Sequence, residues 1–154
     1  MNNVFSYIFL FFVLSAASIK IWLSWRQITT VRLHEDRVPN AFSEDISLEA
    51  HQKAAKYTVA KMKLSNVSTV IDTVLLLALT FGGILNWLFE ISAFTSEGNI
   101  LPGLVFFGLL GLLITAAQLP LDLYKTFILE EKFGFNKMSP SLFVKDFFVG
   151  LIVS

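Results

Sequence analysis

The chain has 154 residues, of which 55% are hydrophobic, 16 are phenylalanine and only 16% are charged. So much apolar surface is typical of a membrane protein and predicts an all-α fold of polytopic transmembrane helices. The net charge of zero gives no electrostatic support for binding nucleic acid. The absence of cysteine excludes disulfides, thiol nucleophiles and cysteine-based metal sites.

Three apolar runs are long enough to cross the hydrocarbon core of a bilayer, which takes about 20 helical residues. They cover approximately residues 4–25, 70–91 and 100–123. A partial fourth run, residues 143–154, is too short to span, so we expect a truncated fourth helix in a piece of a longer protein. The small residues at 15–18 would also suit a cleaved signal peptide. Because no basic residue precedes the first run, retention as a membrane anchor is favoured.

Basic residues are concentrated in alternate connections between the apolar runs. Between the first and second runs lie Arg26, Arg32, Arg37, Lys53, Lys56, Lys61 and Lys63; after the third come Lys125, Lys132, Lys137 and Lys145. The connection between the second and third runs contains no lysine or arginine. Because basic connections stay in the cytoplasm, we expect residues 26–69 and 124–142 there and the N-terminus outside.

The first cytoplasmic connection, residues 26–69, is too long to be structureless in a compact protein. From Ser47 it predicts a helix, with apolar residues recurring on one side and lysines mainly on the others. Glu49 lies near its start, where the helix dipole favours negative charge. This helix can continue into the second span. We favour its lying on the membrane or packing on the spans over a role in docking a partner protein.

Four polar residues fall within or beside the spans, namely Asp72, Asn86, Gln118 and Asp122. The two aspartates are expected near cytoplasmic span ends, where the cost of burial is small. Gln118, followed by the helix-distorting Pro120, is the one that could face a wet interior. For all four, a helix-packing or interfacial role is favoured over a functional one. The pairs Gly82-Gly83 and Gly108/Gly111 are expected to allow close helix packing.

No catalytic or metal-ligating residue is predicted in this chain. His34-Glu35 begins like the zinc motif His-Glu-x-x-His, but its fifth position is Val38. His51 has no adjacent ligand pattern. Glu130 and Glu131 are neighbours, so on a helix their side chains point about 100° apart, and a structural or capping role is favoured over an acid–base pair.

Two segments resemble a known family. Residues 46–61 read Ile-Ser-Leu-Glu-Ala-His-Gln-Lys-Ala-Ala-Lys-Tyr-Thr-Val-Ala-Lys and contain His51, Gln52 and Lys53. Residues 130–137 read Glu-Glu-Lys-Phe-Gly-Phe-Asn-Lys and contain Glu130, Glu131, Phe133, Gly134, Phe135 and Asn136. Both resemble the N-terminal membrane region of CAAX prenyl protease 1-type zinc metalloendopeptidases, and the first is most similar to bacterial members. The resemblance extends over nearly the whole chain.

The resemblance implies that residues 1–154 form the N-terminal transmembrane domain of a membrane protease. Such proteases have membrane helices around a water-filled chamber, and they hold zinc by a His-Glu-x-x-His helix and a later glutamate. Those ligands are expected downstream of Ser154, so this chain is expected to bind no cofactor and to be catalytically incomplete. The implied partners are the bilayer, the downstream catalytic region and a peptide or protein substrate.

The resemblance also implies an integral membrane location, which for a bacterial member is the inner membrane. Residues 133–136 are then expected to pack against the downstream catalytic region. The alternative is a stand-alone membrane scaffold or interaction protein derived from such a protease.

Overall fold

The computed structural model describes residues 4–39, 42, 44–93 and 100–153, and the side chains as far as residue 150. The described part is helical and contains no strand, which confirms the predicted all-α class. Its elements are α1 (Val4–Leu33), α2 (Leu48–Phe81), α3 (Ile84–Ser92), α4 (Leu101–Tyr124), the π-helix η2 (Lys125–Glu130) and α5 (Pro140–Val153).

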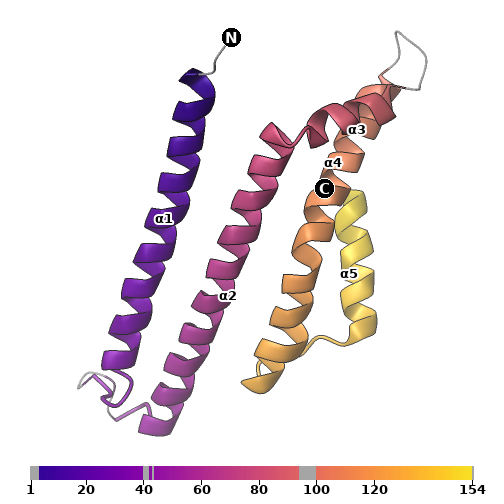
Figure 1. Cartoon of the computed structure of the whole chain (residues 1–154). Coiled ribbons are helices and arrows are strands. Elements are labelled where there is room, and N and C mark those ends of the chain that lie inside the picture. The colour runs from indigo at the N-terminus through magenta and orange to yellow at the C-terminus, as the bar shows by residue number, and fades with distance from the viewer. Residues whose placement is uncertain (1–3, 40–41, 43, 94–99, 154) are drawn as a thin grey trace.

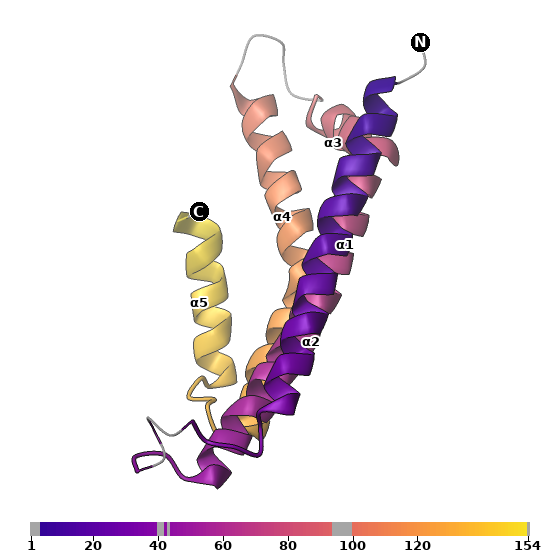
Figure 2. The same ribbon diagram turned by 90° about the vertical axis from the view of Figure 1, so that its left-hand side faces the viewer.

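Long helices α1, α2 and α4 stand beside one another and alternate in direction (Figure 1). The turn from α1 to α2 and the connection from η2 to α5 lie at one end, whereas α3 lies at the other. Three helices are long and apolar enough to cross a membrane, namely Val4–Leu33, Leu48–Phe81 and Leu101–Glu130. This number agrees with the three complete spans predicted from hydropathy. Figure 2 shows that α5 diverges from α4.

Helix α2 joins the predicted amphipathic helix and the second span without a break. It begins where Ser47 Oγ accepts a hydrogen bond from the Ala50 N–H at 3.2 Å, and Glu49 lies in its first turn. Its 34 residues are about 50 Å long at 1.5 Å per residue, which exceeds the hydrocarbon thickness. The lysine-bearing first half therefore projects beyond the apolar second half.

The predicted span 70–91 differs from the structure, because Gly82 and Gly83 divide it. A Cβ on Gly82 would lie 2.4 Å from the Ala78 carbonyl oxygen, and Gly83 has a left-handed φ of 73°. L-residues rarely adopt that backbone conformation, whereas glycine does so readily. The pair thus turns the chain from α2 into α3, in place of the close helix packing that we expected.

The third span is longer than predicted, and the connection after it is shorter. We expected a helix over 100–123 and a connection over 124–142, but the helical chain continues through η2 and the connection narrows to residues 133–139. Pro120 removes one N–H from the ladder of α4, and the wider π turn follows one turn later. The first residue with a left-handed φ after it is Gly134.

Apolar packing is concentrated at the end where α1 and η2 each pack against the first half of α2. Ile28, Ala55, Val59 and Leu129 are buried there. Most large apolar side chains elsewhere are exposed, as on the outside of a helix bundle that faces lipid. Gly108 and Gly111 are also open, since a Cβ added to either would meet nothing within 4 Å. Our expectation of close helix packing at this pair is not met among the described residues.

Replacing Gly83 tests the α2–α3 turn. Gly83→Ala should lower the thermal midpoint of the protein in detergent, because a left-handed alanine costs about 1–2 kcal/mol. Gly111→Ala is the matched control: it lies within α4 with free space around it, so alanine should leave the midpoint unchanged or raise it. Equal midpoints for the two variants would contradict a required left-handed turn.

Candidate functional site

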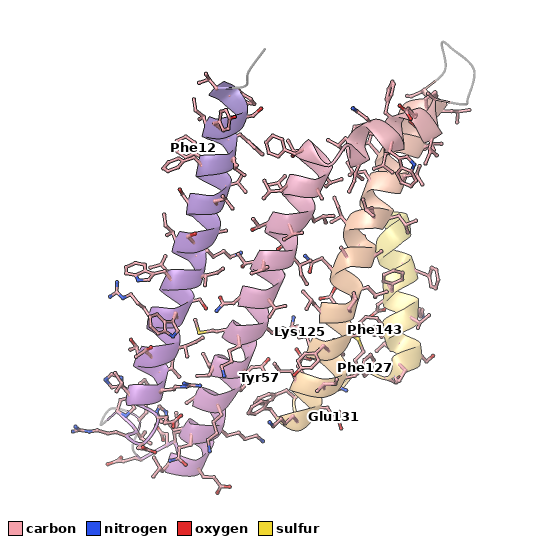
Figure 3. All side chains as sticks on the ribbon, viewed as in Figure 1. Phe12, Tyr57, Lys125, Phe127, Glu131 and Phe143 are labelled. Carbon is pink, nitrogen blue, oxygen red and sulfur yellow. The ribbon has the colours of Figure 1, made fainter. Side chains whose placement is uncertain are left out.

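The two segments singled out in the sequence meet at one end of the bundle. The Tyr57 ring packs edge-on against Phe133 and Phe135, with centroid separations of 5.3 and 4.8 Å. One turn earlier on α2, Lys53 Nζ lies 5.6 Å from the centre of the Phe135 ring. Figure 3 labels Tyr57 and Glu131 at this end of the bundle. We call this cluster of Lys53, Tyr57, Phe133 and Phe135 the aromatic joint.

Gly134 shapes the turn that carries the two phenylalanines. Its φ is 73°, and its N–H donates to the Glu131 carbonyl at 2.9 Å. The next two N–H groups, of Phe135 and Asn136, both donate to the Glu130 carbonyl, at 2.8 and 3.2 Å. Such bonds satisfy the free carbonyls at a helix end, and the left-handed position favours glycine. A Cβ here would be 3.8 Å from Lys53 Nζ, so the backbone conformation, not crowding, requires glycine.

Glu131 and Asn136 stabilise the same turn through their side chains. Asn136 Nδ2 donates to Glu131 Oε2 at 3.0 Å, and Asn136 Oδ1 accepts from the Met138 N–H at 2.7 Å. Ser139 then caps α5, since its Oγ accepts from the Leu142 N–H at 3.2 Å. The Glu131 carboxylate therefore has a structural partner, and Glu130 contributes its backbone carbonyl. These contacts are of the structural kind that we favoured for the glutamate pair.

His51 and Gln52 attach the turn after α1 to the start of α2. Gln52 Nε2 donates to Asp36 Oδ1 at 2.8 Å, and His51 Nε2 donates to the His34 carbonyl at 3.1 Å. His34 Nδ1 in turn donates to the Thr30 carbonyl at 2.8 Å. A carbonyl oxygen only accepts, so His51 Nε2 and His34 Nδ1 are the nitrogens that carry hydrogen, and each ring ties one turn to the neighbouring backbone. Within the described ranges, no three histidine, aspartate or glutamate side chains converge as metal ligands would.

Residues 133–136, which we expected to pack against the downstream region, are partly packed against α2 of this chain. Phe133 is half-buried against Tyr57, but Phe135 is still 49% exposed. Tyr57 lies within residues 46–61, which carry the family resemblance, but it is not among the residues that we predicted to matter. The spacing of Tyr57 could have identified it, because a residue four positions after Lys53 lies on the same face of the helix. Packing of the remaining Phe135 surface against a downstream region stays a prediction.

A second polar cluster lies between α2 and α4, within the apolar part of the bundle. Gln118 Nε2 donates to Asp72 Oδ1. Ser68 Oγ lies 3.3 Å from Asp72 Oδ2 and 3.4 Å from Gln118 Oε1. We call Ser68, Asp72 and Gln118 the polar layer. Its hydrogen bonds are of the helix-packing kind that we favoured for Gln118.

Asp72 does not lie near the end of its span, where we expected it. Because α2 ends at Phe81, Asp72 lies only about 13 Å along the helix from that end and not at a cytoplasmic end. Lys20 of α1 lines a groove of about 280 Å³ together with Asp72. Asp122 lines a different groove, of about 220 Å³, with Lys61 and Lys125, and Asn86 is exposed on α3.

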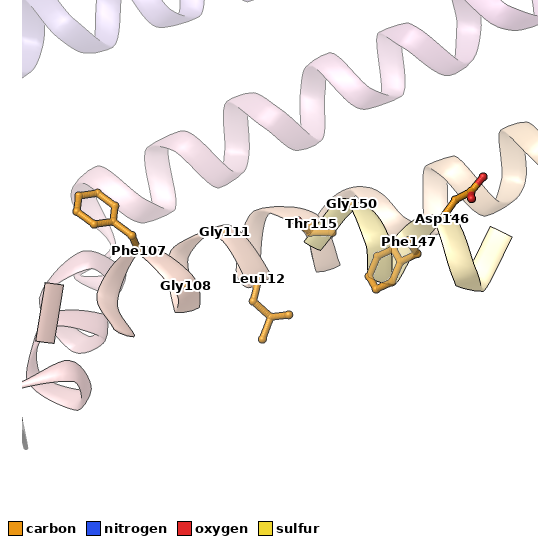
Figure 4. A pocket seen from close by; sticks show the side chains of 8 residues that line it. All are labelled: Phe107, Gly108, Gly111, Leu112, Thr115, Asp146, Phe147 and Gly150. Atoms are coloured by element: carbon orange, nitrogen blue, oxygen red, sulfur yellow. The ribbon is translucent and has the colours of Figure 1, made fainter. Parts of the chain in front are cut away.

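A further groove, of about 550 Å³, lies between α4 and α5 (Figure 4). It is lined by Phe107, Gly108, Gly111, Leu112, Thr115, Asp146, Phe147 and Gly150. Asp146 is the only charged residue in this lining set. One carboxylate without a converging base, nucleophile or second ligand gives no basis for chemistry, so the aromatic joint and the polar layer are the better candidates.

Comparison with known proteins gives a consistent result. Residues 27–154 match a family described as CAAX prenyl protease N-terminal, five membrane helices. The chain is 29% identical to CAAX prenyl protease 1 of Saccharomyces cerevisiae over 93% of this chain and 33% of that protein. It is 34% identical to the human CAAX prenyl protease 1 homolog over 71% of this chain and 24% of that protein.

A solved structure agrees in fold. The crystal structure of S. mikatae Ste24p superposes with a TM-score of 0.87 at 27% sequence identity, covering 99% of this chain and 36% of that one. The chain therefore spans about a quarter to a third of the length of these proteins.

Removing the Tyr57 ring tests the aromatic joint. Tyr57→Ala should loosen residues 133–139 and speed their amide hydrogen exchange, because each lost ring pair contributes about 0.5–1.5 kcal/mol beyond its buried area. Tyr57→Phe should exchange like the parent protein. Tyr7→Ala is the control, since Tyr7 is 72% exposed on α1. Unchanged exchange in Tyr57→Ala would contradict the joint.

Truncating Gln118 tests the polar layer. Gln118→Ala should destabilise the protein by about 1–3 kcal/mol, because the Asp72 carboxylate loses its amide donor within the apolar half of α2. The measurement is reversible unfolding in mixed micelles, with Asn86→Ala as the exposed amide control. The Asp72→Ala background should shrink the effect of Gln118→Ala, and full additivity of the two would show that the side chains are not coupled.

Proposed function

Because the chain belongs to the CAAX prenyl protease N-terminal family, we propose that it is the N-terminal membrane portion of a zinc-dependent membrane endopeptidase. In this proposal α1, α2 and α4 form part of the wall of the protease chamber. The aromatic joint fixes the helix ends on the side where the catalytic region docks. The zinc ligands and the catalytic glutamate come from the downstream region, and the substrate is a peptide or protein.

The observation that carries this proposal is the agreement between the family match and the joint. The match extends over residues 27–154, which include both segments of the joint. Those segments are separated by α3 and α4 in the chain, yet Tyr57 contacts Phe133 and Phe135 directly. A region that sets the geometry of a larger protein needs such a fixed connection between distant segments.

The chemistry of the described residues supports a structural and not a catalytic role for this portion. His34 and His51 donate ring N–H groups to backbone carbonyls, and Glu131 accepts from Asn136. These groups maintain turns at one end of the bundle. Among the described residues they do not converge with a third such side chain, so no catalytic step is assigned to them.

The membrane location follows from the family and the apolar helices, and the orientation is part of the proposal. The turn from α1 to α2 and the connection from η2 to α5 lie at the same end (Figure 1). Most of the lysines and arginines of the chain fall in or beside these two segments. We infer that this end faces the cytoplasm and that the N-terminus lies outside. The relatives named above are eukaryotic, so a bacterial inner membrane rests only on the resemblance of residues 46–61.

Expression with and without the downstream region tests the function. The full-length protein should cleave a farnesylated or unstructured peptide in a zinc-dependent way, and residues 1–154 alone should not. The matched control is His34→Ala with His51→Ala in the full-length protein, which should retain zinc at the stoichiometry of the parent.

Two outcomes would contradict the proposal. Zinc-dependent cleavage by residues 1–154 that disappears on substituting His34 or His51 would place the chemistry in this portion. A coding sequence that stops after Ser154, or that continues without a His-Glu-x-x-His motif, would favour the alternative of a membrane scaffold or interaction protein.

A further inference from the structure

A basic groove lies at the same end of the bundle as the aromatic joint and is separate from the polar layer. It has a volume of about 420 Å³ and lies between the end of α1, the first half of α2 and the residues after η2. Its basic residues are Arg32, Lys56, Lys63 and Lys132, and its one acidic residue is Glu35. Val59, Ala60 and Phe133 complete its lining.

The charge of this groove is poorly compensated. All four basic side chains are exposed, and among the described residues none of them forms an ion pair within 4 Å. Four cations facing one carboxylate give the lining a formal charge of about +3 at neutral pH. Cations gathered in one concave site attract an anion more strongly than the same charges dispersed over a surface.

The depth of the groove matches the headgroup region of a bilayer. Lys63 immediately precedes the apolar half of α2, which runs from Leu64 to Phe81 and is about 27 Å long at 1.5 Å per residue. That length is close to the hydrocarbon thickness, so Lys63 lies at its boundary. Lys56 lies about 10 Å farther out along the same helix.

An apolar groove continues from the basic one toward the hydrocarbon. It has a volume of about 320 Å³ and shares Ala60 and Lys63 with the basic groove. Its other lining residues are Leu64, Val67, Tyr124 and Leu129, which carry no charge. The two grooves together form an elongated site with a cationic outer part and an apolar inner part.

We propose that this double groove binds an anionic phospholipid from the leaflet on the side of the α1–α2 turn. The phosphate lies among Arg32, Lys56, Lys63 and Lys132, and one acyl chain lies along Leu64, Val67 and Leu129. Charge alone would suit free phosphate or an acidic peptide, but neither uses the apolar groove. An anionic lipid matches both parts, and basic pockets between membrane helices bind such headgroups.

Lipid binding to the full-length protein tests the proposal. Native mass spectrometry in detergent would measure the affinity for phosphatidylglycerol and for phosphatidylcholine with the same acyl chains. The parent protein should prefer phosphatidylglycerol. The double variant Lys56→Gln/Lys132→Gln should weaken phosphatidylglycerol binding by roughly ten- to thirty-fold and leave phosphatidylcholine binding unchanged.

Matched variants separate the groove from general charge. Lys137→Gln/Lys145→Gln removes the same charge from exposed lysines outside both grooves and should change the affinity by less than about threefold. Lys56→Arg/Lys132→Arg should retain binding. Val67→Trp should weaken both lipids by filling the apolar groove. If Lys56→Gln/Lys132→Gln does not fold, Lys63→Gln alone provides the same test with a smaller loss.

Three outcomes would overturn the proposal. Equal losses in the Lys56→Gln/Lys132→Gln and Lys137→Gln/Lys145→Gln variants would show only a general charge effect. Competition by glycerol phosphate at the same concentration as the lipid would show a free-phosphate site. An acidic or farnesylated peptide that displaces phosphatidylglycerol at a lower concentration than the lipid needs to bind would assign the groove to a peptide.

Discussion

The arrangement of this chain depends on α2 being one unbroken helix from Leu48 to Phe81. Among the described elements, α1, α3, α4 and η2 all contact it. Its first turns carry the contacts to Asp36 and Phe135, and its apolar half carries Asp72 to Gln118. A helix in hydrocarbon cannot exchange its backbone hydrogen bonds for bonds to water. The distance between the aromatic joint and the polar layer is therefore fixed by the rise of a single helix.

Three contacts, two of ring packing and one of hydrogen bonds, hold other parts of the chain to α2 along its length. Near the Phe81 end, Phe9 packs edge-on with Phe81 at 6.0 Å; farther along lies the polar layer, and then the aromatic joint. Lipid tails are as apolar as leucine, so burial of apolar surface does little to drive helices together within the bilayer. Specific ring pairs and hydrogen bonds matter more there. The buried apolar residues Ile28, Ala55 and Val59 instead lie toward the end where water is available to exclude.

Much of the fold could be predicted from the sequence, because hydropathy and helix caps are local properties. The three spanning helices and the start at Ser47 were found in this way. The turn at Gly83 was missed because glycine pairs are also common at helix contacts, and only the backbone φ separates the two roles. The π turn after Pro120 was missed because a proline indicates a distortion without specifying which one. The family resemblance identified both segments of the joint. Their contact could not be predicted, because it depends on how α4 packs beside α2, which is not a local property of the sequence.

The error over Asp72 shows how one misplaced helix end changes the interpretation of a polar residue. With a span assumed over 70–91, Asp72 lies at the interface, where a carboxylate needs no partner. With α2 ending at Phe81, the same residue lies inside the apolar half, and its carboxylate must be compensated. Gln118 supplies an amide donor and Ser68 a hydroxyl within hydrogen-bond distance. Because Gln118 lies two residues before Pro120, the polar layer also couples α2 to the part of α4 where the helix changes from α to π geometry. The turn that carries Phe133 and Phe135 follows directly, so the placement of α4 by Asp72 also sets where the aromatic joint can form.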